Sequence, residues 1–415
     1  MKRYKLLNNV LGWVVFVIAA VTYILTLEST ASFWDCGEFI ASGYKLEVGH
    51  PPGNPIFMLT ARFFANFASS PSEVAYMVNL MSGLLSAATI LLLFWTITRL
   101  AQKIVLREGE TEETMSLGQM IAILGCGLVG ALAYAWSDTF WFSAVEGEVY
   151  AYSSFCTALV FWLILKWESV ADLPHANRYI ILIAYIIGVS IAVHLLNLLC
   201  IPAIVLVYYY RKYKNTDLKG SLIALLVSFV LIVLLLYGLV PGFVEVAGWV
   251  ELLFVNVFHL PFNSGVVFYF FLIVGVIAWA IYETYAQRSD KLIKISFLIS
   301  IVLVGIPFIG DGYIIGIVLT AALAYYLFTR KKLAVVAMNT ILLSLFVIFI
   351  GYSSYALIVI RSTANTPMDQ NSPEDIFSLG GYLNREQYGD RPLFYGQTFP
   401  CLLYTSPSPR DGLLS

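Results

Sequence analysis

Long apolar segments recur along the whole chain and are separated by short polar connections. A helix that crosses a bilayer needs about 20 consecutive, mostly apolar residues. The predicted spans are 11–27, 74–98, 119–136, 150–167, 179–194, 195–210, 221–240, 265–282, 295–310, 313–329 and 333–352. The pattern therefore predicts an all-α polytopic membrane protein with about eleven transmembrane helices.

The segment 55–68 is apolar but short, and it contains Arg62. Whether it crosses decides the side of every later loop. If it does not cross, all Lys and Arg before residue 361 except Lys45 and Arg62 lie on the side of the N-terminus. Cytoplasmic loops are enriched in these residues. We therefore predict an interfacial helix at 55–68 in the first external loop, a cytoplasmic N-terminus, and an external segment after residue 361.

Composition supports a membrane protein and excludes several other classes. Of the 415 residues, 60% are hydrophobic and 12% are charged, whereas soluble domains carry about 25% charged residues. The net charge of −2 gives no reason to expect a nucleic-acid partner. The absence of Walker and GxGxxG motifs argues against a nucleotide-driven pump. Because HExxH and CxxC motifs are also absent, we predict no dedicated metal site and no cofactor, although a divalent metal requirement stays compatible with the sequence.

The C-terminal end of the sequence has a different character. Residues 401–411, Cys-Leu-Leu-Tyr-Thr-Ser-Pro-Ser-Pro-Arg-Asp, resemble a translated sequencing-library adapter. We interpret 401–415 as a non-native tail and exclude it from reasoning about the fold. The remaining organisation is a transmembrane domain at 1–360 and the start of an external C-terminal segment at 361–400, which we expect to continue in the natural protein.

Acidic residues collect in the predicted first external loop. Asp35 and Glu38 are three residues apart, which places both carboxylates on one face of a short helix. Burial would raise their pKa and a nearby cation would lower it, and either makes them candidate acid–base groups. Alternatively, Asp35 is a helix cap and Glu38 a solvated loop residue.

Other polar residues are predicted at the same side of the membrane. Glu146 and Glu148 share a face only in extended structure, so in a helix one would point away from the site. They are otherwise interfacial loop carboxylates. His194 is a ligand or a packing residue, and Arg361 a phosphate partner or an interfacial anchor. The remaining candidates are His50, before a rigid Pro-Pro-Gly turn, and Asn197.

Several of these segments carry a resemblance to a known family. The segments are Trp34–Phe39, Gly49–Pro55, Ala144–Ala151, Val193–Leu199 and Gly381–Pro392. They resemble motifs of the bacterial protein O-mannosyltransferase-like membrane proteins of the GT-C glycosyltransferase superfamily. The resemblance implies a GT-C-like fold in a bacterial inner membrane, with an active site on the extracytoplasmic face.

The resemblance also implies a chemistry and its residues. The activity would be inverting transfer of a mannose-like sugar from a polyprenyl-phosphate donor to an acceptor protein or glycan, with membrane lipid as the surroundings. Asp35 matches the family's first acidic position and would be the general base. Glu38 matches the second and would orient the acceptor or Asp35. The other matching positions have no assigned role: His50, Glu146, Glu148, His194 and Asn197. The competing classes are a transporter or lipid flippase, which usually shows paired halves, and a scaffold without chemistry.

Overall fold

The computed structural model describes residues 3–309, 313–330, 332 and 334–389. Within these residues every regular element is a helix, and a single isolated bridge joins Val48 to Asp369. The predicted all-α fold is therefore confirmed. The predicted tail at 401–415, and the part of the C-terminal segment after residue 389, lie outside the described residues.

Eight helical stretches of the described chain are long and apolar enough to cross a membrane. They are Arg3–Leu25, Pro71–Val105, Leu117–Ala135, Val149–Val170, Leu195–Lys212, Leu218–Asn256, Ser264–Ala286 and Val335–Ser362. Three more predicted spans are helical but shorter: α8 (Arg178–Ile191), α13 (Asp290–Leu303) and α14 (Tyr313–Thr329). The predicted count of about eleven spans is therefore not confirmed, although each predicted span contains a helix.

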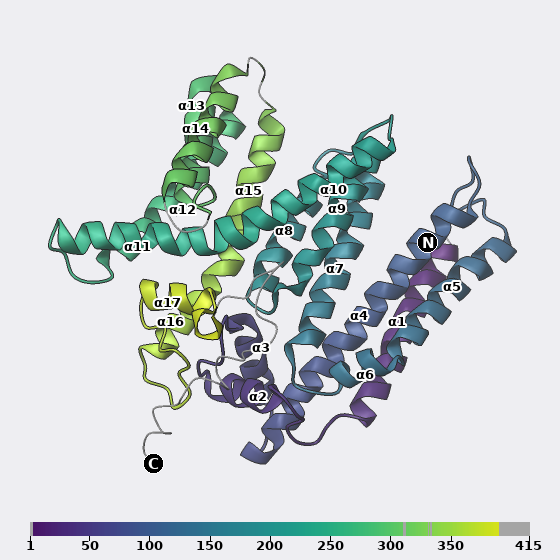
Figure 1. Cartoon of the computed structure of the whole chain (residues 1–415). Coiled ribbons are helices and arrows are strands. Elements are labelled where there is room, and N and C mark those ends of the chain that lie inside the picture. The colour runs from purple at the N-terminus through teal and green to yellow at the C-terminus, as the bar shows by residue number, and fades with distance from the viewer. Residues whose placement is uncertain (1–2, 310–312, 331, 333, 390–415) are drawn as a thin grey trace, which may run out of the picture.

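Three helices form the first group of the bundle (Figure 1): α1 (Arg3–Leu25), α4 (Val74–Val105) and α5 (Leu117–Ala135). Their shared core buries Tyr23, whose hydroxyl donates to the carbonyl of Ala135 at 2.9 Å. Helix α4 also packs against α7 (Val149–Val170). The short α6 (Asp138–Ala144) connects α5 to α7 at one end of this group.

A close helix crossing joins the middle of the bundle to its C-terminal part. Helix α8 packs against α15 (Val335–Tyr352), and Gly188 and Gly351 meet at the crossing. A Cβ added to Gly188 would lie 2.6 Å from the carbonyl oxygen of Ile348. Small residues let helix backbones approach this closely in membranes, so this crossing depends on glycine.

One helix runs further than the sequence predicted. The span predicted at 221–240 is α10 (Leu218–Val233), which continues through a π-helical turn at Leu234–Leu239 into α11 (Val240–Asn256). Pro241 does not end the helix, because it lies two residues after the π-helical turn at Leu234–Leu239, where the regular i→i−4 bonding that a proline would break is already interrupted. Helix α11 lies across the other long helices in Figure 1.

The remaining long helices are α9 (Ile201–Lys212) and α12 (Ser264–Ala286), and both end at the same end of the bundle as the N-terminus. We call this the basic end. We call the opposite end, which holds α2, α3 and α6, the site end (lower in Figure 1). The membrane orientation of these two ends stays a prediction.

A hairpin of two short helices lies at the site end: α2 (Cys36–Lys45) and α3 (Pro55–Ala65). They pack closely where a Cβ on Gly43 would contact Ala61, and Arg62 of α3 donates to the carbonyl of Tyr44. At about 1.5 Å rise per residue, the 11 residues of α3 reach only about half of the roughly 30 Å hydrocarbon core. The predicted short helix in the first loop is therefore confirmed.

Candidate active site

Glu38 and His50 form a hydrogen-bonded pair at the centre of the site end. Glu38 lies in the first turn of α2, and Oε1 accepts from the His50 backbone N–H at 2.6 Å and contacts His50 Nδ1 at 2.8 Å. Burial raises the pKa of Glu38, but the His50 hydrogen bonds outweigh burial and lower it below its usual value. The same bond raises the pKa of His50. The Glu38 carboxylate is therefore held by its hydrogen bonds to His50 and is not a solvated loop residue.

Asp35 stands beside this pair with a free carboxylate. It occupies the N-cap position of α2, but its side chain makes no capping bond and no other hydrogen bond within the described residues. Its charge nevertheless acts on the pKa of His50 and of Glu148. The neighbouring Phe33 and Trp34 are 83% and 92% exposed, so they do not pack against the bundle. Asp35 therefore has the N-cap position that the alternative expected, but its exposed side chain makes no capping bond.

Glu146 and Glu148 converge instead of diverging. Both are 6% exposed and lie in the turn between α6 and α7, with Glu148 in extended conformation. Burial is the main cause that raises the pKa of the Cys36 thiol, and the charges of both carboxylates raise it further. Cys36 Sγ lies 4.0 Å from Glu148 Oε2. The expectation that one of the two would point away was tied to a helix, and the turn removes that condition.

Burial has a large effect on Glu148. Burial raises its pKa to about 7, helped by the negative charges of Asp35 and Glu146 and opposed by the Val149 backbone N–H and by His50. A carboxyl group in this range exchanges protons near neutral pH, which is where acid–base groups are useful. Glu148 is therefore a buried carboxyl group of the site that can change its protonation state near neutral pH.

We expect Glu148 to make the protein less stable as pH rises. The folded pKa near 7 lies above the usual value of 4.5, so the folded state binds more protons between these values and stability falls with pH across this window. The loss is about 3 kcal/mol at most. Glu148→Gln should remove this decline in thermal unfolding scans between pH 5 and 8. The exposed Glu28→Gln is the matched control, and an unchanged slope in Glu148→Gln would contradict the assignment.

His194 and Asn197 have different surroundings. His194 Nδ1 accepts from the Leu196 N–H at 3.2 Å, and its ring lies 5.5 Å from that of Tyr150. Burial, followed by the charge of Arg385, lowers its pKa. Asn197 is 1% exposed and accepts from the Thr157 hydroxyl at 3.3 Å. The structure thus brings His194 toward the site end, whereas Asn197 holds the turn before α9 against α7.

Arg361 is not placed with the carboxylates. It lies in α16 (Ala356–Ser362), and its guanidinium donates to the carbonyls of Leu46 at 2.6 Å and Lys45 at 3.4 Å. These carbonyls belong to the C-terminal end of α2, opposite to Asp35. Arg361 therefore fixes the position of α2, where the sequence suggested a phosphate partner or an interfacial anchor.

The chain after Arg361 closes over the first loop. Val48 exchanges backbone hydrogen bonds with Met368 and Gln370, and the Gln370 side chain lies close enough to Glu38 to help lower its pKa. Tyr382 of α17 (Ile376–Leu383) donates to the Gly49 carbonyl at 2.6 Å. We call residues 361–389 the closing segment, and it completes one wall of the site.

Arg385 is the site residue that sequence reasoning missed. It is exposed in the closing segment and has a left-handed backbone conformation. Its positive charge adds to the lowering of the His194 pKa and opposes part of the rise that Glu38 causes in the His50 pKa. Its position within the motif at Gly381–Pro392 was the available signal. Within the described residues, no three His, Cys, Asp or Glu side chains are arranged to hold a metal ion.

Part of the chain is similar to proteins that are named protein O-mannosyl-transferases. Residues 35–217 match the model of the protein O-mannosyl-transferase TMEM260 N-terminal domain. The chain is 27% identical over 209 residues to the protein O-mannosyl-transferase TMEM260 of Mus musculus, covering 50% of this chain and 27% of that protein. It is 23% identical over 189 residues to the Dictyostelium discoideum protein of the same name, covering 44% of this chain and 20% of that protein. No solved structure matches.

The chain thus spans about a quarter of the length of the curated relatives that it matches. The matched range nevertheless begins at the free carboxylate of the site. It contains Asp35, Glu38, His50, Glu146, Glu148, His194 and Asn197. The range ends before Arg361 and Arg385, so the closing segment lies outside the similarity to the family model.

Proposed function

We propose that this chain is a membrane glycosyltransferase that moves a mannose-like sugar from a polyprenyl-phosphate donor to a Ser or Thr hydroxyl of an acceptor protein. One observation carries the proposal. The free Asp35 carboxylate stands beside the Glu38–His50 pair and the charge of buried Glu148, at the start of the range that matches the O-mannosyl-transferase family model. The proposed setting is a bacterial inner membrane with the site end on the extracytoplasmic face, which the basic residues at the opposite end support.

In the proposed reaction Asp35 acts as the general base. The acceptor hydroxyl attacks the anomeric carbon, Asp35 takes the hydroxyl proton, and a new C–O bond forms. The bond from the anomeric carbon to the lipid phosphate oxygen breaks at the same time, so the configuration inverts and polyprenyl phosphate leaves. Asp35 suits this step because its carboxylate makes no hydrogen bond within the described part of the chain, whereas Glu38 already accepts from His50.

The leaving phosphate needs positive charge or hydrogen-bond donors. His50 directs Nδ1 to Glu38, and the raised pKa of His50 favours an imidazolium whose Nε2–H can donate to an anion. Arg385 supplies a permanent charge on the same side, close enough to act on His50 and His194. We assign the donor phosphate to His50 and Arg385, in place of Arg361.

This assignment predicts different outcomes for two arginine variants. Arg385→Gln should raise KM for the lipid donor about tenfold, the loss of one charged hydrogen bond, with little change in thermal stability. Arg361→Gln should lower thermal stability, because the carbonyls of Lys45 and Leu46 lose their donor. Initial rates at varied donor concentration and unfolding scans separate the two. A normal melting temperature with raised donor KM in Arg361→Gln would return the phosphate role to Arg361.

The proposed function is tested by reconstitution. The purified protein is placed in sealed liposomes with polyprenyl-phosphate mannose, and a Ser/Thr-rich acceptor peptide is added on the side of the site end. We expect donor-dependent labelling of the peptide and none when it is confined to the side of the basic end. Donor movement across the bilayer without labelling would instead favour a flippase. Neither labelling nor donor movement would contradict both activities.

A further inference from the structure

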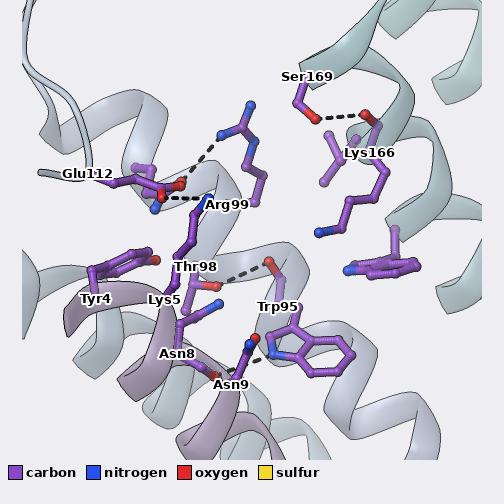
Figure 2. A pocket seen from close by; sticks show the side chains of 13 residues that line it. Tyr4, Lys5, Asn8, Asn9, Trp95, Thr98, Arg99, Glu112, Lys166 and Ser169 are labelled. Atoms are coloured by element: carbon purple, nitrogen blue, oxygen red, sulfur yellow. Dashed lines mark hydrogen bonds and ion pairs between the residues drawn. The ribbon is translucent and has the colours of Figure 1, made fainter. Parts of the chain in front are cut away.

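A polar cavity lies at the basic end, far from the carboxylates of the candidate site. It has a volume of about 420 Å³ and opens between the start of α1 and the ends of α4 and α7 (Figure 2). Three cationic side chains from three helices line it: Lys5, Arg99 and Lys166. Glu112, from the connection between α4 and α5, is the acidic residue of the lining. The convergence of separate helices makes the cavity a property of the fold.

The positive charge of this cavity is only partly compensated. Glu112 lies 3.7 Å from the Lys5 ammonium. Arg99 donates to Gln102 at 3.4 Å, and the Lys166 ammonium lies 4.9 Å from the ring centre of Trp162, but neither has an ion pair within the described chain. By contrast, Lys103, one turn after Arg99, is paired with Glu168. Arg99 and Lys166 therefore have no ion pair within the described chain, although the carboxylate of Glu168 pairs with Lys103 nearby.

The floor of the cavity connects it to the lipid-facing side of the bundle. Trp95 and Trp162 lie in the lining with ring centres 5.9 Å apart. Trp13 contacts Trp95 edge to face at 6.3 Å and is 54% exposed, on the same apolar face of α1 as the exposed Leu6 and Val10. The apolar tail of an occupant can therefore extend from the cavity along this face of α1. The cavity thus combines two cations without ion pairs in the described chain, which suit an anion, with an apolar exit along α1.

We propose that this cavity binds the headgroup of an anionic phospholipid such as phosphatidylglycerol. The phosphodiester contacts Arg99 and Lys166, and the acyl chains follow the apolar face of α1 past Trp13. Basic pockets between helices near a membrane surface recognise lipid phosphates in this way. The site is independent of the sugar-transfer chemistry proposed at the other end.

Lipid binding by the purified full chain tests the proposal. Native mass spectrometry of the protein with dioctanoyl phosphatidylglycerol should show one lipid that binds saturably and more tightly than dioctanoyl phosphatidylcholine. Arg99→Gln and Lys166→Gln should each weaken this binding about tenfold. Arg178→Gln is the matched control, because Arg178 is an exposed cation at the same end that contacts only the Tyr179 ring.

The same experiment can overturn the proposal in three ways. Equal binding of the two lipids would show that the cavity does not distinguish an anionic from a zwitterionic headgroup. Equal effects of all three variants would show that binding reflects general surface charge. Binding of water-soluble glycerol phosphate with the affinity of the lipid would assign the cavity to a soluble phosphate. Lys166→Gln keeps the test decisive if Arg99→Gln does not fold, since Lys166 contacts only a ring face.

Discussion

Replacing Asp35 with Asn should lower turnover by about 10²–10⁴-fold, the usual contribution of a general base. The amide keeps the shape of the side chain but cannot take the acceptor proton. Donor binding and folding should change little, because the Asp35 side chain makes no hydrogen bond that the substitution would remove. The measurement is the initial rate at saturating lipid donor, on variants with the same melting temperature.

The matched variant for Asp35→Asn is Glu38→Gln. A glutamine can still accept from the His50 backbone N–H, so the orienting role is partly kept and turnover should fall less. The raised pKa of His50 depends on the charge of Glu38, so this variant should also shift the pH profile of the rate toward lower pH. Near-normal turnover in Asp35→Asn would eliminate Asp35 as the base and move the role to Glu148 or Glu146.

Gly188→Leu should cause the largest loss of stability of any single substitution considered. The new side chain would meet the backbone of α15 at Ile348, which cannot move aside as a flexible side chain can. Overpacking a tight site costs about 1–3 kcal/mol, occasionally more. Because α8 leads to His194 and α15 leads to the closing segment, separating these helices should also lower transfer activity. Thermal unfolding in detergent measures the first effect and the transfer assay the second.

Gly275→Leu is the control for Gly188→Leu. Gly275 lies in α12, and a Cβ there meets nothing within 4 Å. Leucine also favours a helix over glycine by close to 1 kcal/mol, so this substitution should leave stability unchanged or raise it. A melting temperature of Gly188→Leu equal to that of Gly275→Leu would show that the α8–α15 crossing is not the tight contact described.

The sequence was most informative where a physical constraint leaves a local pattern. Hydropathy placed a helix at every predicted span because a bilayer demands continuous apolar length. The distribution of basic residues indicated that 55–68 does not cross, and α3 has the corresponding short length. Asp35 and Glu38 stood out because carboxylates between aromatic residues are costly without a purpose.

Contacts between distant segments left no such pattern. Arg361 and Tyr382 bond to backbone carbonyls of the first loop, and a carbonyl is present at every residue, so no residue type marks the partner. The convergence of Glu146 and Glu148 on Cys36 depends on a turn whose conformation is set by the helices on either side. Helix α11 was missed because a proline inside a helical pattern usually marks its end, and the π-helical turn just before Pro241 leaves no pattern in the sequence.

The closing segment also sets the order in which a newly made chain can mature. Its contacts with the first loop join residues 315 and 333 positions apart, and Tyr355, just before the segment, bonds the Gly53 carbonyl 302 positions away. At about 5–20 residues per second, translation of the intervening chain takes roughly 15–60 s. During that time the hairpin has emerged from the ribosome, but the carbonyls of Leu46, Gly49 and Gly53 lack their final donors. Insertion of the helices therefore precedes formation of the candidate site, and a nascent chain interrupted before α15 would be a membrane protein in which one wall of that site is missing.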